Sequence, residues 1–325
     1  MQEFDPTLLR QLYIPPSSSH KGQNGKVLLI GGSHLFHAST LWALEIASKV
    51  VDMVFYASVP ENNEIVQKNK EVFRNGIVVP QMDIENYIQE ADAILLGPGM
   101  ERVEVRSKEY EVESLKDILA ISNQGEQTYY VTKYLLQKYP QKKWVIDAGA
   151  LQMLDLEWLK QLGGNVILTP HHQEFETLKS KSSLRGDASK RRFGEASTLG
   201  VQSTSIGEIA TSSSTPRNDE VELFARKYNC IVLLKGETDI ICSPEQCVEI
   251  PGGNAGMTKG GTGDVLAGLV TALAAKNDLF LSACAGSYIN KKAGESLFKK
   301  VGYYFNSTDL VNEIPKVMKD LIGDR

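Results

Sequence analysis

The residues best suited to chemistry lie in a glycine-rich segment, 252–268, that reads GGNAGMTKGGTGDVLAG. Gly261 and Gly263 let the backbone approach a ligand closely, because glycine has no Cβ. Asp264 follows and opens an apolar stretch that we expect to be a helix. Backbone N–H groups at a helix N-terminus bind anions, and a carboxylate beside them can take a proton from a hydroxyl group. The segment predicts an anion site in which Gly261, Thr262, Gly263 and Asp264 act together.

Asp264 also has a simpler explanation, because aspartate is a preferred N-cap residue that stabilises the start of a helix. Glycines and threonines are concentrated just before Asp264, however, and a plain helix cap does not need them. We therefore favour a functional role for this carboxylate.

Short buried strands are expected along the chain, nearly all followed at once by glycine or polar residues. They alternate with helical patterns, which is typical of a parallel sheet covered by helices. In such a sheet ligands bind outside the carboxyl ends of the strands, so one large site should lie along one sheet edge. The expected strands are 26–30, 53–57, 93–96, 144–147, 165–168 and 230–234, with 239–241 and 247–250 as a short antiparallel pair, and the expected helices are 39–51, 262–275, 279–298 and 308–321.

Further candidate side chains stand at these strand ends. Asp147 also suits a turn or a helix cap, Lys235 and Gly236 also suit a tight turn, and His171 with His172 also suits an ordinary loop. A zinc site would need a third ligand at suitable spacing, and none is evident. We therefore assign no metal ligand among the protein side chains.

The composition is that of a globular protein, since 42% of the 325 residues are hydrophobic and 23% are charged. We expect a single domain, 1–325, with surface insertions at 101–130 and 179–219, where charged or small polar residues predominate. A formal net charge of -5 and one short basic run, 190–192, argue against a nucleic-acid partner.

The sequence shows neither a signal-peptide pattern at its N-terminus nor the run of about 18 apolar residues that a membrane span needs. The four cysteines, Cys230, Cys242, Cys247 and Cys284, contain no CxxC pair. We expect them to be reduced thiols in a cytoplasmic protein without a membrane partner.

Neither a P-loop nor a GxGxxG dinucleotide motif is found. Instead, Gly-Thr-Gly-Asp at 261–264 resembles the anion-hole and base motif of ribokinase-like kinases. The longer segment 253–268 resembles the signature of ADP/ATP-dependent NAD(P)H-hydrate dehydratases. Further segments resemble that family in the same order along the chain: 21–33, 36–40, 97–99, 145–151, 169–175 and 235–239.

Four positions depart from the family pattern. Ser39 takes the place of a substrate-contacting alanine, Gly149 replaces an aspartate, and Gln173 and Lys259 stand where small residues are common. The resemblance implies a three-layer, ribokinase-like α/β fold, with a mostly parallel central sheet and helices on both faces.

The resemblance also implies a reaction: dehydration of the S-epimer of hydrated NADH or NADPH, driven by ADP or ATP with Mg²⁺ through a phosphorylated intermediate. Asp264 would be the base, and the partners would be small molecules, within a symmetric homo-oligomer. The implied substrate contacts are Ser39, Gly99, Asp147, His171, Asn254 and Asp264, and the implied nucleotide contacts are Lys235, Gly236, Glu237, Thr238, Asp239 and Gly263.

Two other functions remain open at this point. A ribokinase-like kinase for a sugar or vitamin precursor shares Gly-Thr-Gly-Asp and would release a stable phosphorylated product. A regulator that binds a nucleotide without turning it over is compatible with the departures from the family pattern.

Overall fold

A computed structural model describes residues 1–103, 109–191 and 218–323. Its centre is one ten-stranded sheet in the order β1-β10-β9-β8-β7-β6-β5-β2-β3-β4. Only β9 runs antiparallel to its neighbours among these strands. The strands are β1 (Gln2–Glu3), β2 (Lys26–Ile30), β3 (Met53–Ala57), β4 (Ile77–Val78), β5 (Ala93–Leu96), β6 (Lys143–Ile146), β7 (Val166–Leu168), β8 (Ile231–Leu234), β9 (Thr238–Cys242) and β10 (Cys247–Pro251).

Both faces of the sheet are buried, because successive side chains along a strand point to opposite faces. On β2, Val27 and Leu29 join one hydrophobic core, whereas Leu28 and Ile30 join the other. This explains why the central strands read as continuous apolar runs rather than alternating ones.

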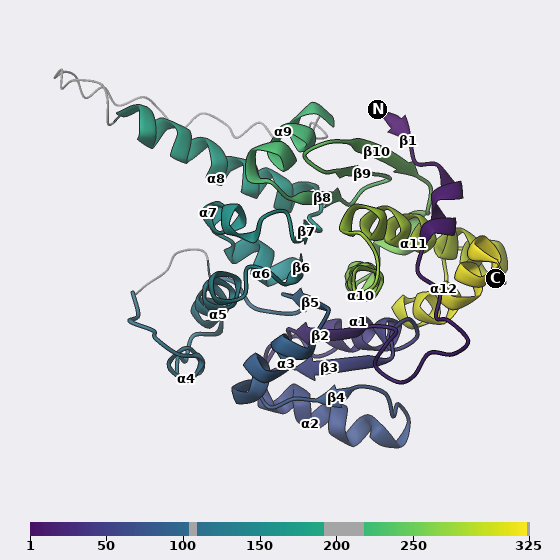
Figure 1. Cartoon of the computed structure of the whole chain (residues 1–325), viewed down its shortest axis with the longest axis horizontal. Coiled ribbons are helices and arrows are strands. Elements are labelled where there is room, and N and C mark those ends of the chain that lie inside the picture. The colour runs from purple at the N-terminus through teal and green to yellow at the C-terminus, as the bar shows by residue number, and fades with distance from the viewer. Residues whose placement is uncertain (104–108, 192–217, 324–325) are drawn as a thin grey trace.

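Helices form a layer on each face (Figure 1). The first core is covered chiefly by α1 (Ser39–Ala47), α10 (Thr262–Ala274), α11 (Leu279–Val301) and α12 (Ser307–Ile322). The second is covered by α3 (Ile84–Glu90), α4 (Leu115–Leu119), α5 (Gln124–Lys138), α6 (Ala148–Met153), α7 (Leu156–Leu159), α8 (His172–Arg191) and α9 (Asn218–Tyr228), while α2 (Pro60–Lys68) lies along the edge near β4. The predicted three-layer α/β fold is confirmed.

The chain reverses its direction across the sheet between β2 and β5. From β2 it proceeds through β3 to β4 at one edge, then returns to β5 on the other side of β2 and continues through β6 and β7 to β8. Ligands of open α/β sheets bind at such a switch point, outside the carboxyl ends of the strands. The loops that follow β2 and β5 therefore flank the expected site.

The two segments predicted as insertions contain more regular structure than expected. α5 places Tyr130, Val131 and Leu135 in the second core, so it is part of the helical layer. α8 continues to Arg191, which makes the prediction of a loop from residue 179 wrong for 179–191. Residues 179–191 include three lysines, two arginines, one leucine and one alanine, and these are good helix formers. Residues 104–108 and 192–217 lie outside the described part of the chain.

Candidate active site

The N-terminus of α10 forms one end of the site. Gly261 is its N-cap, with a φ of 93°, and a Cβ there would lie 2.3 Å from the Trp42 ring. Only glycine fits this close, left-handed turn. The first-turn amides of a helix have no intrahelical acceptor, and among the described residues no side chain caps this terminus. The turn therefore presents N–H donors and the positive end of the helix dipole to a ligand.

A cavity of about 850 Å³ opens in front of this helix terminus. Its walls combine the turn after β8, the loop after β10, the start of α10 and part of α11. The lining residues are His171, Lys235, Gly236, Glu237, Asp239, Gly252, Gly253, Asn254, Ala255, Met257, Thr258, Thr262, Gly263, Leu266, Asn290 and Lys291. The size and the mixed polar and apolar lining suit a small organic ligand with an anionic group.

A buried ion pair joins the ends of two strands at this cavity. Lys235, directly after β8, places its Nζ 2.9 Å from Oδ1 of Asp147, directly after β6. Asp147 is 2% exposed, and its carboxylate binds this ammonium rather than capping α6. A Cβ at Gly263 would lie 3.6 Å from the same Nζ. The ammonium thus stands beside the first turn of α10, where it adds to the positive potential.

Charges from three carboxylates surround Lys235. Burial alone would lower the pKa of its ammonium, but the charges of Asp147, Glu174 and Asp264 outweigh burial and raise it. Lys235 therefore stays protonated at neutral pH. Its position is fixed partly by the neighbouring strand end, because its backbone N–H donates to the carbonyl of Pro170 at 2.8 Å.

Asp264 is the acidic side chain of the first turn of α10. Burial and the nearby charge of Asp147 raise the pKa of its carboxyl group to about 7, while Lys235 and a hydrogen bond with Ser39 act in the opposite direction. A group with a pKa near neutrality is well matched to accept a proton at physiological pH. Because Asp264 stands at the third helical position and Gly261 occupies the N-cap, the plain N-cap explanation of Asp264 is wrong.

The glycine turns after β2 and β5 meet next to Ser39, which hydrogen-bonds with Asp264. The Gly32 amide donates to the Pro98 carbonyl at 2.7 Å. Gly99 has a φ of 68°, and a Cβ there would lie 3.2 Å from the Cβ atoms of Phe36 and Ser39. The backbones of the switch-point loops therefore pack tightly next to Ser39, and side chains are excluded.

Lys291 of α11 holds the turn from Lys235 to Asp239 in place. The Nζ of Lys291 donates to the carbonyls of Gly236, Glu237 and Gly252 at 2.9, 2.8 and 3.1 Å, and lies 3.3 Å from Asp239. Lys291 is 5% exposed. The sequence prediction missed this residue, since Lys291 lies inside an apolar helix and only the packing of α11 brings it to the turn.

Two residues that were predicted to contact a ligand, Thr262 and Asn254, make hydrogen bonds within the protein. The Thr262 hydroxyl donates to the carbonyls of Met257 and Lys259, so Thr262 supports the loop while its residue lines the cavity. Asn254 uses both side-chain groups, accepting from the Gly256 amide at 2.9 Å and donating to the Gly294 carbonyl at 2.8 Å.

His171 and Glu174 form a reciprocal pair. The His171 amide donates to the Glu174 carboxylate at 3.0 Å, and the Glu174 amide donates to Nδ1 of His171 at 3.2 Å. A parallel bridge sets His171 beside Lys235, and both line the cavity.

The structure shows what surrounds Gly149 and Lys259, two residues that depart from the family pattern. A Cβ at Gly149 would lie 2.2 Å from the Met100 carbonyl oxygen, so no side chain fits there. Lys259 donates to the Tyr303 and Phe305 carbonyls and lies over the Phe305 ring, which ties the glycine loop to the start of α12. The ammonium of Lys259 is thus engaged outside the cavity.

The structure therefore brings Ser39, Asp147, Lys235 and Asp264 together around the start of α10, with Gly99 next to Ser39. His171, Asn254, Gly236, Glu237 and Asp239 line the adjoining cavity, whereas Thr238 is exposed at the start of β9 and is absent from its lining. Their roles as substrate or nucleotide contacts stay predictions.

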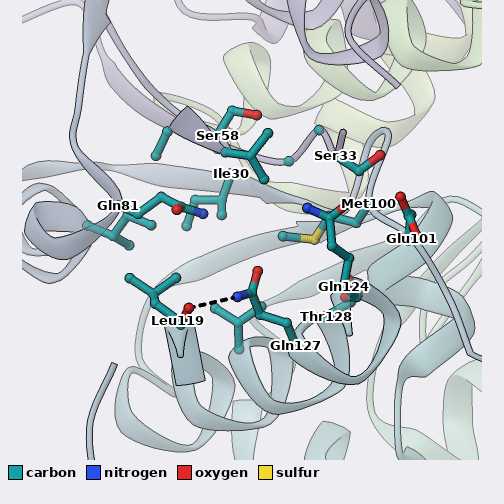
Figure 2. Close-up of a pocket in the computed structure, with 16 residues that line it drawn as sticks. Ile30, Ser33, Ser58, Gln81, Met100, Glu101, Leu119, Gln124, Gln127 and Thr128 are labelled. Atoms are coloured by element: carbon teal, nitrogen blue, oxygen red, sulfur yellow. Dashed lines mark hydrogen bonds between the residues drawn. The ribbon is translucent and has the colours of Figure 1, made fainter. Parts of the chain in front are cut away.

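A second, much smaller cavity lies between the ends of β2 and β3 and helix α5 (Figure 2). Its volume is about 30 Å³, and Ser33, Ser58 and Gln127 are among the residues that line it. One water occupies roughly 10–15 Å³ on this measure, so the cavity has room for about two waters and not for a nucleotide.

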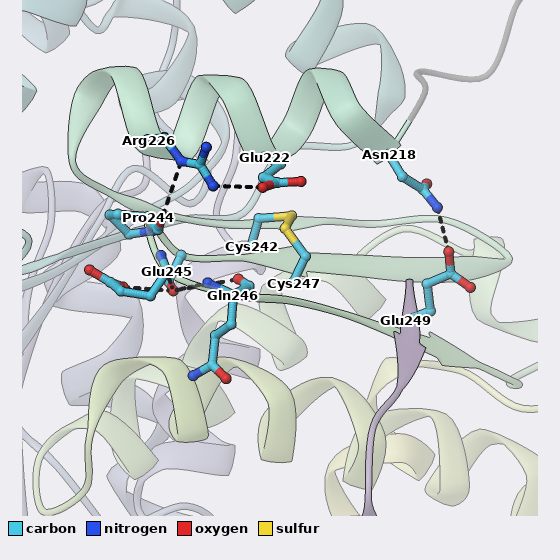
Figure 3. The surroundings of a disulfide bond; sticks show 10 residues. Asn218, Glu222, Arg226, Cys242, Pro244, Glu245, Gln246, Cys247 and Glu249 are labelled. Carbon is cyan, nitrogen blue, oxygen red and sulfur yellow. Dashed lines mark hydrogen bonds and ion pairs between the residues drawn. A yellow bond between two sulfur atoms is a disulfide. The ribbon is translucent and has the colours of Figure 1, made fainter.

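The β9–β10 hairpin beyond the Lys235–Asp239 turn carries a correction. Cys242 and Cys247 form a disulfide across it (Figure 3), so the expectation of four reduced cysteines is wrong for this pair. The two residues stand directly opposite each other in the antiparallel ladder, where side chains on one face are adjacent. Cys230 and Cys284 are free and buried, as predicted.

The fold and the site together define an α/β protein with a ribokinase-like fold and one large cavity among the described residues, and the structure of a ribokinase-like superfamily protein of Enterococcus faecalis shares that fold, with a TM-score of 0.71 and 19% identity. The model of the NAD(P)H-hydrate dehydratase family matches residues 27–316. The chain belongs to that family, as the sequence resemblance implied.

Individual relatives agree with this assignment. The chain is 34% identical over 311 residues to the bifunctional NAD(P)H-hydrate repair enzyme Nnr of Methanocaldococcus jannaschii, of which it spans 51% while 96% of its own length is covered. It is 33% identical to the ADP-dependent (S)-NAD(P)H-hydrate dehydratase of Nitrosopumilus maritimus, with 96% of each protein covered. The structure of the Bacillus subtilis ADP/ATP-dependent NAD(P)H-hydrate dehydratase, co-crystallised with ATP and Mg²⁺, matches with a TM-score of 0.70, 20% identity and 98% of each chain covered.

Proposed function

We propose that this protein is a nucleotide-dependent dehydratase that converts the S-epimer of hydrated NADH or NADPH back to NADH or NADPH. The observation that carries the proposal is the position of Asp264, a carboxyl group with a pKa raised to about 7, in the first turn of α10 beside the Lys235 ammonium. The family assignment and the relatives described above support the choice of substrate.

In the first step, Asp264 takes the proton from the C6 hydroxyl group of the hydrated nicotinamide ring. The oxygen forms a bond to the terminal phosphorus of ADP, and the bond from that phosphorus to the leaving AMP breaks. With ATP, the leaving group is ADP. Negative charge develops on the phosphoryl oxygens, and the Gly263 and Asp264 amides together with Lys235 stabilise it from fixed positions.

In the second step, the new phosphate ester leaves as inorganic phosphate. The C6–O bond breaks, and C5 loses a proton that the phosphate carries away, which restores the C5–C6 double bond. Phosphate is a much better leaving group than hydroxide, and this is why a nucleotide is consumed. Ser39, which hydrogen-bonds with Asp264, and Gly99, which packs against Ser39, would position the hydrated ring.

The donor set fits a Mg²⁺ ion that arrives on the nucleotide. Mg²⁺ keeps several waters and takes most of its other ligands from substrate phosphates, and Asp147 and Asp264 are two carboxylates close enough for the charge of the first to raise the pKa of the second. Bound there, the ion would neutralise charge on the phosphates. Among the described residues, no group of three or more His, Cys, Asp or Glu forms a separate metal cage.

The proposal is tested by incubating the protein with the S-epimer of hydrated NADPH and either ADP or ATP. We expect the near-ultraviolet absorbance of the reduced nicotinamide to return, with one inorganic phosphate released per ring restored. A stable phosphorylated product would instead indicate a ribokinase-like kinase. Nucleotide binding without turnover of either substrate type would indicate a regulator. Because the Nitrosopumilus maritimus relative is named ADP-dependent, we expect ADP to be the better co-substrate.

A further inference from the structure

The loop that leads into α10 depends on other parts of the molecule for its shape. Between β10 and α10 the chain has one short turn, 255–258, and five glycines in residues 252–261. Glycine gives a backbone more conformational freedom than other residues do. An anion site, however, is most effective when its donors are fixed before the charge develops. The contacts that hold this loop therefore decide how well the start of α10 can stabilise a phosphoryl group.

Two hydroxyl groups hold the carbonyls of this loop. The Thr262 hydroxyl donates to the Met257 and Lys259 carbonyls at 2.6 and 2.9 Å. The hydroxyl of Ser307, the first residue of α12, donates to the Gly260 carbonyl at 2.8 Å. In a planar trans peptide the carbonyl and the next N–H point in opposite directions. Holding the Gly260 carbonyl therefore also fixes the direction of the Gly261 amide.

Lys259 joins the same loop to the segment that precedes α12. Its ammonium donates to the Phe305 carbonyl at 2.6 Å and to the Tyr303 carbonyl, and it lies 5.1 Å from the centroid of the Phe305 ring. The ring also packs on Gly256, where a Cβ would lie 2.6 Å from a ring carbon. Phe305 is 2% exposed, so the loop is attached at two points to a residue that is itself fixed in the core.

These contacts depend on the length and the charge of Lys259. Hydrogen bonds from a charged donor are roughly twice as strong as neutral ones, and a small side chain at this position would not reach the two carbonyls. The described residues that line the large cavity do not include Lys259. Any effect of this lysine on the reaction is therefore transmitted through the loop rather than by contact with a ligand.

We propose that Lys259 is a positioning residue, which holds the anion-binding turn 260–263 against the segment before α12 and so speeds phosphoryl transfer. This inference rests on the proposed function, which places the phosphoryl group at the start of α10. Lys259 and Ser307 act on neighbouring peptide groups of one loop, so loss of either should loosen the same amides. The hydrated nicotinamide ring meets other residues, and its binding should depend little on Lys259.

Lys259→Met tests the proposal, because methionine keeps an unbranched side chain without a donor. A misplacement of about 1 Å can cost on the order of 10²-fold in rate, so kcat for dehydration should fall by about tenfold or more. KM for hydrated NADPH should change little. Lys259→Arg keeps a cation with several donors and should restore most of the rate.

A second measurement does not require turnover. Titration calorimetry with ADP and with adenosine gives the ratio of the two affinities, which isolates the contribution of the phosphates. This ratio should fall in Lys259→Met and stay near the wild-type value in Lys259→Arg. Ser307→Ala removes the other support of the loop and should lower the ratio and kcat in the same way.

The matched control is Lys276→Met. Lys276 is an exposed lysine just beyond the other end of α10, and its ammonium also lies over an aromatic ring, 5.5 Å from the centroid of Tyr13. This variant should keep both kcat and the affinity ratio of wild type. An equal loss in Lys276→Met would overturn the inference, and so would a folded Lys259→Met protein that keeps both wild-type values, even if it unfolds at a lower temperature.

The two measurements also separate this inference from the proposed reaction. Wild-type protein that binds ADP more tightly than adenosine but fails to dehydrate its substrate would overturn the proposed reaction, while the affinity ratio in Lys259→Met would still decide the role of Lys259. Equal binding of ADP and adenosine by wild type would overturn the anion site and this inference with it.

Discussion

At the scale of single residues, the site depends on the carboxyl group of Asp264, whose pKa is shifted in opposite directions by its neighbours. Burial and Asp147 favour its protonated form, and Lys235 and Ser39 favour its ionised form. Asp264→Asn keeps the shape of the side chain but removes the proton acceptor. We expect the rate of dehydration to fall by about 10²–10⁴-fold, the usual contribution of a general base. The assay is the nucleotide-dependent return of reduced-nicotinamide absorbance.

Nucleotide binding is the control for that variant. The amides and Lys235 that face the phosphates are unchanged in Asp264→Asn, so its affinity for ADP should stay within a few-fold of wild type. Turnover at the wild-type rate would refute the assignment of Asp264 as the base. Loss of ADP binding would mean that the carboxylate acts on the nucleotide rather than on the substrate hydroxyl.

The pH dependence of kcat/KM provides a second test at this residue. The base must be ionised to accept a proton, and its pKa is raised to about 7. Activity should therefore fall tenfold per pH unit below about pH 7 and level off above it. Stability should change in the opposite direction: a carboxyl group with a folded-state pKa above its unfolded value of 3.8 stabilises the fold at low pH, and this contribution is lost as pH rises through 7.

Comparison of wild type with Asp264→Asn isolates both effects. The variant should lack the acidic limb in its residual activity, and its free energy of unfolding should vary less between pH 4 and pH 7. An acidic limb that persists unchanged in the variant would assign the titration to another group.

Asp264 was predictable because glycines and threonines mark its surroundings in one continuous segment. Lys291 was not, since it lies in a largely apolar helix and has no recognisable role until helix packing shows which carbonyls it meets. Lys259 shows the reverse case: its place next to the glycines suggested phosphate, but its ammonium binds carbonyls of the loop before α12.

At the scale of elements, the turn from β6 into α6 explains one departure from the family. A Cβ at Gly149 would lie 2.2 Å from the Met100 carbonyl oxygen, which is closer than real contacts allow. Gly149→Asp would restore the usual family residue, yet we expect it to lower the free energy of unfolding by roughly 1–3 kcal/mol through overpacking. Chemical denaturation measures this change, and dehydration activity should not improve.

Gly149→Ala separates the steric effect from the charge. It adds only the Cβ and should cause most of the same loss of stability. A neutral Gly149→Ala, or a Gly149→Asp variant that is more active than wild type, would show that the loop around Met100 moves aside and that the missing carboxylate matters for the reaction.

The β9–β10 hairpin gives a prediction about thiol chemistry. Cys242 and Cys247 are disulfide-bonded, and Cys230 and Cys284 are free but buried, with burial raising the pKa of both thiols. A thiol reagent should therefore label none of them rapidly in the folded chain, because the thiolate is the reactive form. Denatured protein should show two reactive thiols without a reductant and four after reduction.

Cys242→Ser is the control for this count, because it should free Cys247 and raise the number in denatured, unreduced protein from two to three. Four thiols in unreduced wild type would contradict the disulfide. The strand pairing of this hairpin was predicted from the sequence, but two cysteines across a short turn were not interpreted as a pair.

At the scale of the whole molecule, the central strands were predictable because both of their faces are buried, which leaves long apolar runs in the sequence. β1 and β4 were not, since each has only two residues and pairs in parallel with a strand distant in sequence or separated by a helix. The walls of the cavity were only partly predictable. Glycine and polar residues mark the ends of the strands in the sequence, whereas the wall formed by α11 depends on how that helix packs.

The cavity joins segments that are far apart in the chain, and this leads to a prediction for the whole fold. The turn 235–239, the loop 252–257, the start of α10 and the middle of α11 all line it. A nucleotide that bridges them should stabilise the protein by about 2.7 kcal/mol when its concentration is 100 times Kd. Hydrogen exchange with ADP present should slow in these four segments together, because they can open only after the ligand leaves. The distant edge formed by β3 and β4 should change much less, and Asp264→Asn should keep the pattern. Protection confined to one segment would show that the nucleotide does not span the cavity, and the proposed placement of its phosphates at α10 with the rest of the molecule along the cavity would then be wrong.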